Sequence, residues 1–247
     1  MTSCATSANP VLALNCAEER AQVVLGSGQG LLFSEEILCP GQSIRHLPTA
    51  IERALKVHGL SVKELAGIAC VRGPGSFTGL RISHATMYGL ARPFGTPMAG
   101  LSYLEILAAQ AAPLVDGEIW ILTYARKAQV YVQGFADGHP LSQVRPMHAS
   151  EARDLLATRP GPLRLLGSGL RKNPDLCGLP GTTPLPPEFD VPRPDALLRA
   201  ALNATYLSAL PAPLYLRKSD AEDNLESIAS SRGIAAEQAR RLIPNFE

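Results

Sequence analysis

The sequence predicts an α/β protein of two lobes, each with a mixed sheet flanked by helices. Short apolar runs separated by Gly and Ser turns are typical of sheet strands, and longer segments have apolar residues at helical spacing. The same order of elements then occurs a second time along the chain. The 247 residues are 46% hydrophobic and 18% charged. This composition is that of an ordinary globular protein with enough apolar material for a sizeable core.

The first half of the chain begins with three closely spaced strands, at residues 11–16, 21–26 and 31–37. The tight turns between them indicate an antiparallel meander. An apolar stripe predicts a helix over residues 43–57, and Gly59 follows its end. The remaining elements are a capping-box turn at 61–64, a strand at 67–71, a helix at 78–91, a strand at 97–101 and a helix at 102–112.

The second half repeats this order. Strands are expected at 118–123, 129–135 and 141–144, a helix at 149–157, a strand at 163–167, an irregular Pro- and Gly-rich loop at 173–194, a helix at 194–210 and a last strand at 214–217. This order, three strands followed by a helix, a strand, a helix and a strand, is that of the ribonuclease-H-like unit. The actin-like ATPase fold uses this unit twice. We expect an N-terminal lobe at 1–112, a C-terminal lobe at 113–219 and a polar tail at 220–247, with a short amphipathic helix at 234–242.

A loop rich in glycine connects the strand at 67–71 to the helix at 78–91. We call it the signature loop, made of Gly73, Pro74, Gly75, Ser76, Thr78 and Gly79. Ser76 or Thr78 can cap the helix, so the loop is either a structural joint or an anion site at a helix N-terminus. No lysine follows its last glycine, which excludes a P-loop, and the glycine spacing does not fit the dinucleotide fingerprint.

Composition also limits the kind of partner and the compartment. A net charge of +1 gives no general basic field, so strong RNA binding by this chain alone is not expected. The five cysteines are scattered, and Cys16 and Cys70 lie in apolar runs, which indicates reduced, buried thiols. The N-terminus lacks the features of a signal peptide, and no apolar segment approaches membrane-spanning length. We therefore expect a cytoplasmic protein with no membrane contact.

Catalytic and metal-binding residues are not apparent. In the actin-like fold the turn after the first strand normally carries an acid that helps hold a metal-bound nucleotide, but Asn15 stands there, and Tyr124 stands at the equivalent place in the second half. Glu18 and Glu19 are expected to be solvated turn residues. No two histidines stand at i, i+4, and Ser76 lacks the second glycine of a nucleophile elbow. We assign no catalytic residue and no metal ligand, and we interpret His84 as a surface or interface histidine.

Five segments of the chain are distinctive: RGPGSFTGLRIS at residues 72–83, VKELAGIA at 62–69, LSYLE at 101–105, ARKAQVY at 125–131 and PLYLR at 213–217. Together, and RGPGSFTGLRIS most strongly, they resemble the TsaB (YeaZ) family of tRNA threonylcarbamoyladenosine biosynthesis. The family usually has aspartate where this chain has Asn15 and Tyr124, and the tail after Arg217 has no match to the family.

The resemblance implies a non-catalytic scaffold subunit that binds and stabilises a catalytic paralogue, TsaD. That paralogue carries the metal-binding histidines and transfers a threonylcarbamoyl group to the adenosine next to the anticodon, position 37, of tRNAs that read codons beginning with A. The resemblance further implies a small ATPase partner, TsaE, self-association as a homodimer, and contact with tRNA through the complex. The resemblance implies no cofactor for the chain alone. It implies that ATP or ADP, where bound, lies at the interface of the complex.

In this family the two helices of the N-terminal lobe form the partner interface, which here means residues 43–57 and 78–91. The interface residues implied are His46, Leu47, Ile51, Arg81, His84, Ala85 and Tyr88. The second helix is apolar on more than one side, so it is either enclosed within its own fold or docked on a partner. A competing hypothesis is an actin-like-fold kinase or acyltransferase that uses ATP and acts alone.

Overall fold

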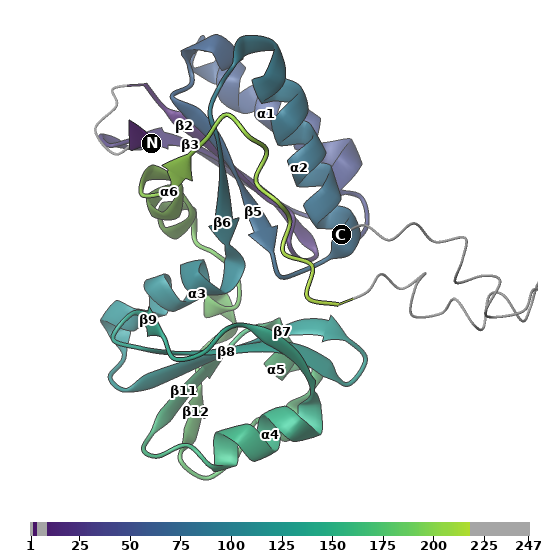
Figure 1. Cartoon of the computed structure of the whole chain (residues 1–247), viewed down its shortest axis with the longest axis vertical. Helices are drawn as coiled ribbons and strands as arrows, with labels where there is room; N and C mark the ends of the chain where they lie inside the picture. Colours follow the sequence, from purple (N-terminus) through teal and green to yellow (C-terminus); the bar gives the residue numbers. More distant parts are fainter. Residues whose placement is uncertain (1, 4–8, 218–247) are drawn as a thin grey trace, which may run out of the picture. The chain divides into compact units, whose positions relative to one another are not determined.

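The computed structural model describes residues 2–3 and 9–217 (Figure 1). The predicted tail at 220–247, with its short helix, lies outside the described residues. By spatial contacts the chain divides into a unit of residues Met1–Leu214 and a unit of residues Tyr215–Glu247. The first of these units contains both sheets.

The first sheet has five strands in the order β4-β3-β2-β5-β6. Their bounds are β2 (Val11–Asn15), β3 (Arg20–Ser27), β4 (Gly30–Leu38), β5 (Gly67–Gly73) and β6 (Met98–Ser102). The first three form the expected antiparallel meander, while β5 runs parallel to β2 and β6 parallel to β5. The predicted order of elements in the first half is therefore confirmed.

Helices cover both faces of this sheet, and alternate residues of β2 contact the two layers. Leu12 and Leu14 share a core with α1 (Ser43–Val57) and α2 (Phe77–Ala91), which also contains the buried thiols of Cys16 and Cys70. The side chains of Val11 and Ala13 point to the other face, where α3 (Tyr103–Ala111) and α6 (Pro194–Leu202) pack. A strand buried on both faces has a continuous apolar sequence, as β2 does.

The second sheet follows the path β10-β8-β7-β11-β12, with β9 paired to β8. Its elements are β7 (Glu118–Arg126), β8 (Gln129–Ala136), β9 (His139–Pro140), β10 (Arg145–His148), α4 (Ala149–Ala157), β11 (Leu163–Leu166), α5 (Ser168–Lys172) and β12 (Thr182–Pro184). β8 and β10 are antiparallel to their neighbours, whereas β11 and β12 run parallel to β7 and β11. Both sheets thus have the same strand order and directions, which confirms the duplicated ribonuclease-H-like unit.

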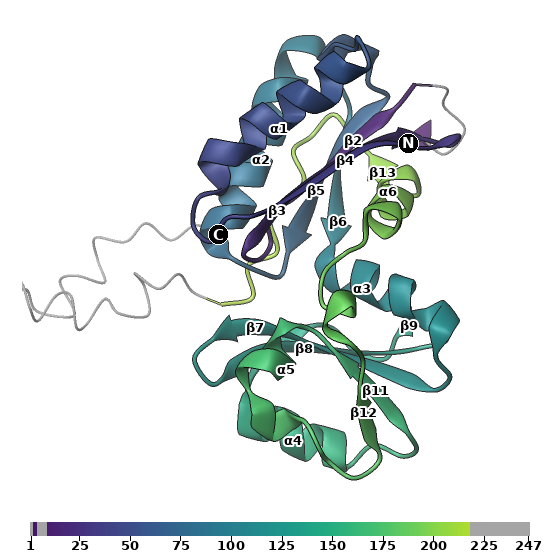
Figure 2. The ribbon, with the colours of Figure 1, turned by 180° about the vertical axis from the view of Figure 1, so that it is seen from behind.

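Helix α3 belongs to the cores of both sheets. Its buried residues Leu104 and Leu107 lie in one apolar cluster with Val11 of β2 and with Ile119 and Ile121 of β7. Figure 2, seen from behind, shows α3 between the two sheets. The two sheets therefore share a continuous apolar core around one helix.

Helix α6 differs from expectation in both length and place. It ends at Leu202 rather than at residue 210, and it packs on β2 and β3 of the first sheet. A Cβ added to Gly26 of β3 would lie 2.6 Å from Leu198 Cδ2, so the glycine makes room for this helix. Beyond α6, Tyr206 of β13 (Thr205–Tyr206) pairs with Thr2 of β1 (Thr2–Ser3), and Leu207 bridges to Met98 of β6. The lobe boundary at residue 112 stays a prediction, but residues 194–207 pack with the first sheet.

Three other local predictions were wrong. The strand expected at 141–144 is replaced by β10 at Arg145–His148, which has Pro146 in an edge strand, where a missing N–H is tolerated. β12 lies in the segment expected to be an irregular loop, and residues 214–217 form no strand. Short 3₁₀ turns complete the described elements at Val62–Glu64, Arg92–Phe94, Ala112–Leu114, Pro174–Leu176 and Pro187–Phe189.

Among the residues with described placement, none of the helices combines the length and the apolar character needed to span a bilayer.

Candidate functional site

The signature loop turns the chain from β5 into α2. Gly73 has a φ of +126°, a backbone conformation that other residues adopt only with strain. Ser76 is the N-cap of α2, because its Oγ accepts a hydrogen bond from the Gly79 N–H at 3.2 Å. Of the two predicted caps, Ser76 rather than Thr78 performs this role, and the side chain of Thr78 is exposed.

The same loop packs directly on the main chain at the end of β2. The Ser76 N–H donates to the Ala17 carbonyl oxygen at 2.6 Å. A Cβ at Gly75 would overlap that oxygen, and a Cβ at Gly79 would overlap the Cys16 carbonyl oxygen. Because the Ser76 N–H is already bonded within the protein, the geometry favours a structural joint over an anion site.

Asn15, at the position where the fold normally has an acid, is bonded within its own turn. Its Oδ1 accepts from the Ala17 N–H at 2.9 Å, and its Nδ2 donates to Gln22 Oε1 at 2.7 Å. Gln22 in turn donates to Glu36 Oε2 at 2.7 Å and to the Pro192 carbonyl oxygen at 2.8 Å. Asn15 is buried, so its side chain stabilises the β2–β3 turn.

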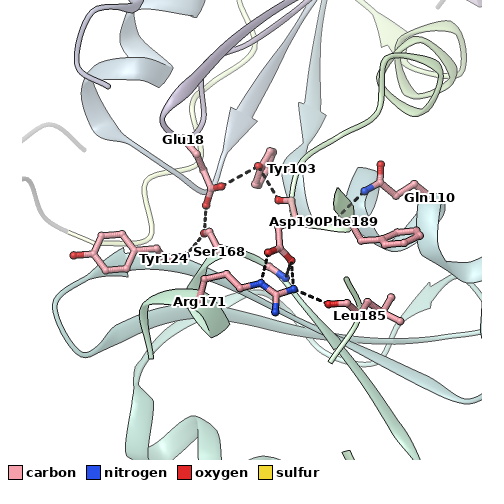
Figure 3. A network of polar contacts seen from close by, with 10 residues as sticks. Glu18, Tyr103, Gln110, Tyr124, Ser168, Arg171, Leu185, Phe189 and Asp190 are labelled. Carbon is pink, nitrogen blue, oxygen red and sulfur yellow. Dashed lines mark hydrogen bonds and ion pairs between the residues drawn. The ribbon is translucent and has the colours of Figure 1, made fainter. Parts of the chain in front are cut away.

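Glu18 lies in that turn but is not the solvated residue we expected. Its carboxylate is partly buried and accepts hydrogen bonds from the Ser168 hydroxyl, at the start of α5, and from the Tyr103 hydroxyl of α3 at 3.2 Å (Figure 3). Ser168 Oγ also accepts from the Tyr124 N–H at 2.9 Å. A carboxylate on the first sheet is thus held by a serine on the second. The expectation for Glu18 was wrong because its partners are distant in the sequence.

Asp190 forms the other polar centre of this junction. Its carboxylate is buried, accepts from the Gly167 N–H at 2.7 Å and forms an ion pair with Arg171 Nε at 2.7 Å. The Arg171 guanidinium also donates to the Leu185 carbonyl oxygen at 2.6 Å, and the Tyr103 hydroxyl lies 3.5 Å from the Asp190 carbonyl oxygen. The Asp190 charge is therefore compensated inside the protein by Arg171.

Glu19 makes a second connection between the sheets. Its side chain is exposed, as expected, and pairs with Lys172 Nζ of α5 at 2.6 Å. The same ammonium group lies 4.3 Å from the ring centroid of Tyr124. An exposed ion pair of this kind contributes little free energy by itself.

Burial dominates the protonation chemistry of the junction. It raises the pKa of Glu18 from 4.5 to about 7, against the opposing effect of the hydrogen bonds from Ser168 and Tyr103. Asp190 raises the pKa of Glu18 further, and Lys172 lowers it. Burial, followed by the charge of Glu18, raises the pKa of Tyr103 well above its ordinary value. Glu18 is therefore a carboxyl group that changes charge near neutral pH.

The residues assigned to a partner interface divide into buried and exposed groups. Leu47 and Ile51 face the first sheet and belong to its core, and His84 is also buried. This corrects the sequence interpretation, since the apolar stripe of α1 is used inside the subunit. His46 is half-buried. The exposed members, all on α2, are Arg81, Ala85 and Tyr88.

His84 is not the surface histidine we expected. Its Nδ1 lies 2.7 Å from the Leu80 carbonyl oxygen, so this nitrogen carries the proton that donates, while its buried Nε2 has no hydrogen-bond partner. Burial lowers its pKa, and the nearby Arg72 charge lowers it further. The ring is neutral at pH 7 and packs as part of the fold.

The solvent side of α2 forms a continuous band, which we call the outer stripe. It consists of Thr78, Arg81, Ala85, Tyr88, Gly89 and Arg92. The Tyr88 side chain is 42% exposed, and nothing lies within 4 Å of where a Cβ at Gly89 would be. The Arg81 guanidinium stacks 3.8 Å from the Phe77 ring centroid. A shallow surface of small residues with one aromatic residue, flanked by two arginines, suits close packing against another protein.

Sequence reasoning missed Tyr103, Ser168, Arg171 and Asp190, which build the junction. Tyr103 stands in the segment LSYLE, which carried no role for it, and Asp190 and Arg171 lie in or next to a segment expected to be irregular. The available signal was weak: two adjacent acids, Glu18 and Glu19, in the turn that the fold places nearest the other lobe.

Comparison with known proteins connects this geometry to a family. The family model of TsaD, tRNA N6-adenosine threonylcarbamoyltransferase, matches residues 40–158. The chain is 33% identical over 123 residues to the tRNA threonylcarbamoyladenosine biosynthesis protein TsaB of Escherichia coli strain K12, covering 49% of this chain and 52% of that protein. It therefore spans about half the length of that relative. With TsaB of Bacillus subtilis strain 168 it is 31% identical over 191 residues, which cover 73% of this chain and 81% of the relative.

The chain belongs to the TsaB family. The solved structure of YeaZ from Pseudomonas aeruginosa supports the TsaB fold, with a TM-score of 0.65 at 21% identity, over 97% of this chain and 100% of that one. Within a TsaB fold, the signature loop described above is the joint that fastens α2 to the end of β2.

Proposed function

We propose that this chain is the non-catalytic scaffold subunit of the machinery that makes threonylcarbamoyladenosine in tRNA. In this proposal it binds and stabilises a TsaD-type catalytic paralogue. Membership of the TsaB family supports the pathway, because the relatives from Escherichia coli and Bacillus subtilis are named for tRNA threonylcarbamoyladenosine biosynthesis. The similarity of residues 40–158 to the TsaD family model supports a paralogue of the same fold as the partner.

The observation that carries the proposal is the outer stripe of α2. The inner side of this helix, with Leu80 and Met87, is fully buried, whereas Ala85, Tyr88 and Gly89 form a shallow exposed surface. A helix that is already packed on its sheet and still has small and aromatic residues in solvent fits a partner helix. In this proposal α1 contributes its exposed residues beside the stripe, and the same surface serves a homodimer when the paralogue is absent.

A scaffold role also agrees with the chemistry at the junction. The Asn15 amide is used for the β2–β3 turn, and Glu18 is bonded to Ser168 and Tyr103. Neither side chain is free to hold a metal-bound phosphate in the arrangement described. We therefore propose that ATP or ADP, the TsaE-type ATPase and tRNA are engaged only by the assembled complex, and that the chain acts in the cytoplasm.

Replacing Ala85 by glutamate tests the proposed interface. A charged side chain at the centre of a close-packed contact has to be desolvated without a partner, so we expect Ala85→Glu to weaken binding to the TsaD-type paralogue of the same organism by at least about tenfold, which is about 1.4 kcal/mol. Binding is measured by calorimetry or by co-purification at known concentrations.

Ala109→Glu is the matched control, because Ala109 is an exposed alanine on α3, which packs on the opposite face of the first sheet. It should bind like the unmodified chain. Tyr88→Glu should behave like Ala85→Glu, and circular dichroism should show that all three variants are folded. If Ala85→Glu and Tyr88→Glu bind the paralogue as tightly as the control does, the interface is elsewhere.

A further inference from the structure

The chain has a cavity of about 390 Å³ where the C-terminal end of α3 meets β7 and β8 of the second sheet. In Figure 1 this end of α3 lies beside β9. None of the described residues that line the cavity belongs to the polar junction around Glu18 and Asp190. Binding sites for small molecules have volumes of about 300–1,000 Å³, so this cavity can hold a small organic ligand or a side chain of another protein.

Apolar side chains form the inner part of this cavity. Ala108 of α3, Ile119 of β7 and Phe135 of β8 line it, and all three are buried members of the core that α3 shares with both sheets. Ala112 and Val115 also line the cavity and pack against the same core. A ligand that covers these side chains removes apolar area from water, which favours its binding.

Two carboxylates lie at the mouth of the cavity. Asp116 comes before β7 and Asp137 follows β8, and both line the cavity with exposed side chains. Within the part of the chain that the structure describes, neither carboxylate has a hydrogen bond or an ion pair, and no lysine, arginine or histidine lines the cavity. The nearby Glu118, by contrast, is paired with Arg159. The mouth therefore carries uncompensated negative charge next to an apolar interior.

We propose that this cavity binds an organic cation, in which a guanidinium or ammonium group is carried on an apolar body. The apolar body lies against Ala108, Ile119 and Phe135, and the cationic group lies at the mouth, where Asp116 and Asp137 attract it and accept its hydrogen bonds. The two carboxylates repel an anion, and a neutral ligand gains only the apolar contact. The inference does not depend on the scaffold role proposed above.

Titration of the full chain with phenylguanidine, followed by NMR of the backbone amides, tests the site. The amide signals of Gly117 and Gly138, which line the cavity, should shift together and saturate with a Kd on the order of 1 mM, an ordinary value for so small a ligand. Phenylurea has the same shape without the charge and should bind at least about tenfold more weakly, because the charge-assisted hydrogen bonds are lost. Equal affinity for the two compounds, or shifts that leave both glycines unchanged, would overturn the proposal.

Asp116→Asn together with Asp137→Asn removes the charge and keeps the shape of both side chains. Asparagine also tolerates the φ of +51° at residue 137, so the turn is preserved. This double variant should bind phenylguanidine at least about tenfold more weakly than the unmodified chain. Asp154→Asn with Asp175→Asn is the matched control, because it removes two exposed carboxylates from α4 and the following 3₁₀ turn, which pack on the other face of the second sheet. Equal binding by the two double variants would contradict the role of Asp116 and Asp137.

A free organic cation and an arginine side chain of another protein present the same chemistry to this cavity. N-acetylarginine methylamide is the probe for the second source. Tighter binding of this capped arginine than of phenylguanidine identifies a protein side chain as the occupant, and the reverse order identifies a free cation. Ala112→Leu fills the cavity without changing a charge and should weaken the binding of both probes by at least about tenfold, in a chain that circular dichroism shows to be folded. Unchanged binding of both probes by Ala112→Leu would place them outside the cavity and overturn the proposal.

Discussion

At the scale of single residues, the glycines of the signature loop are required by how closely two segments of main chain approach each other. Gly75 and Gly79 lie against the carbonyl groups of Ala17 and Cys16, with no room for a methyl group. The obstacle is backbone rather than the end of a flexible side chain, so the neighbouring turn cannot move without disturbing β2. The loop is therefore a packing feature that positions the first turn of α2.

Gly79→Ala should destabilise the fold by about 3 kcal/mol or more, because the added methyl group overlaps the Cys16 carbonyl oxygen. Gly89→Ala is the control on the same helix, since its added methyl group meets open solvent. The control should be neutral or more stable by about 0.5–1 kcal/mol through its better helix propensity. Urea unfolding followed by circular dichroism compares the two. Equal stability of the two variants would mean that the close approach is not rigid.

At the scale of elements, α2 and α6 show why apolar content alone does not place a helix. α2 carries apolar residues on more than one side. Of these apolar residues, only Leu80, Met87 and Ala91 are fully buried. α6 was expected with the second sheet by its position in the chain. Its Leu197, Leu198 and Ala201 instead complete the core below β2 and β3. The position of each helix therefore depends on which apolar sheet surface it can cover, and its own apolar content does not identify that surface.

Leu197→Ala tests whether α6 is part of the first sheet's core. Leu197 is fully buried, so its truncation should leave a cavity and cost about 3 kcal/mol of unfolding free energy. Leu210→Ala is the matched change at a leucine that is 43% exposed and should cost less than about 1 kcal/mol. The two costs are measured by chemical denaturation. Similar small costs for both would contradict the packing of α6 described here.

At the scale of the whole molecule, two copies of one sheet topology share a core through α3, and the polar end of their junction is filled by the protein's own side chains. Glu18, Ser168 and Tyr103 bond to one another there, and Asn15 is used in its turn. This arrangement agrees with the proposed scaffold role and does not require a nucleotide at the junction.

Calorimetric titration with Mg-ATP distinguishes the scaffold from an enzyme that acts alone. We expect no saturable heat from the purified chain at nucleotide concentrations up to about 1 mM, a limit that corresponds to about 4 kcal/mol of binding free energy. The TsaD-type paralogue, purified in the same way, is the comparison sample. Stoichiometric binding together with ATP turnover by this chain alone would favour the kinase or acyltransferase alternative.

Much of the secondary structure could be predicted from the sequence. The meander, α1 at 43–57 and α4 at 149–157 follow from periodicity and turn residues, which are local signals. β12 was missed because it is short and lies among Pro and Gly residues. Leu47, Ile51 and His84 were assigned to an interface because the family resemblance names the two helices, and a resemblance of this kind does not say which side of each helix is covered by the chain's own sheet.

The sequence by itself determined the fold class, the duplicated order of elements and the family, because each depends on residues close together in the chain. Only the tertiary structure decided which side of α2 faces solvent, where α6 packs and that Glu18 is held by a serine 150 residues away. These features depend on contacts between distant segments, and no local pattern records which surfaces meet when the two sheets close around α3.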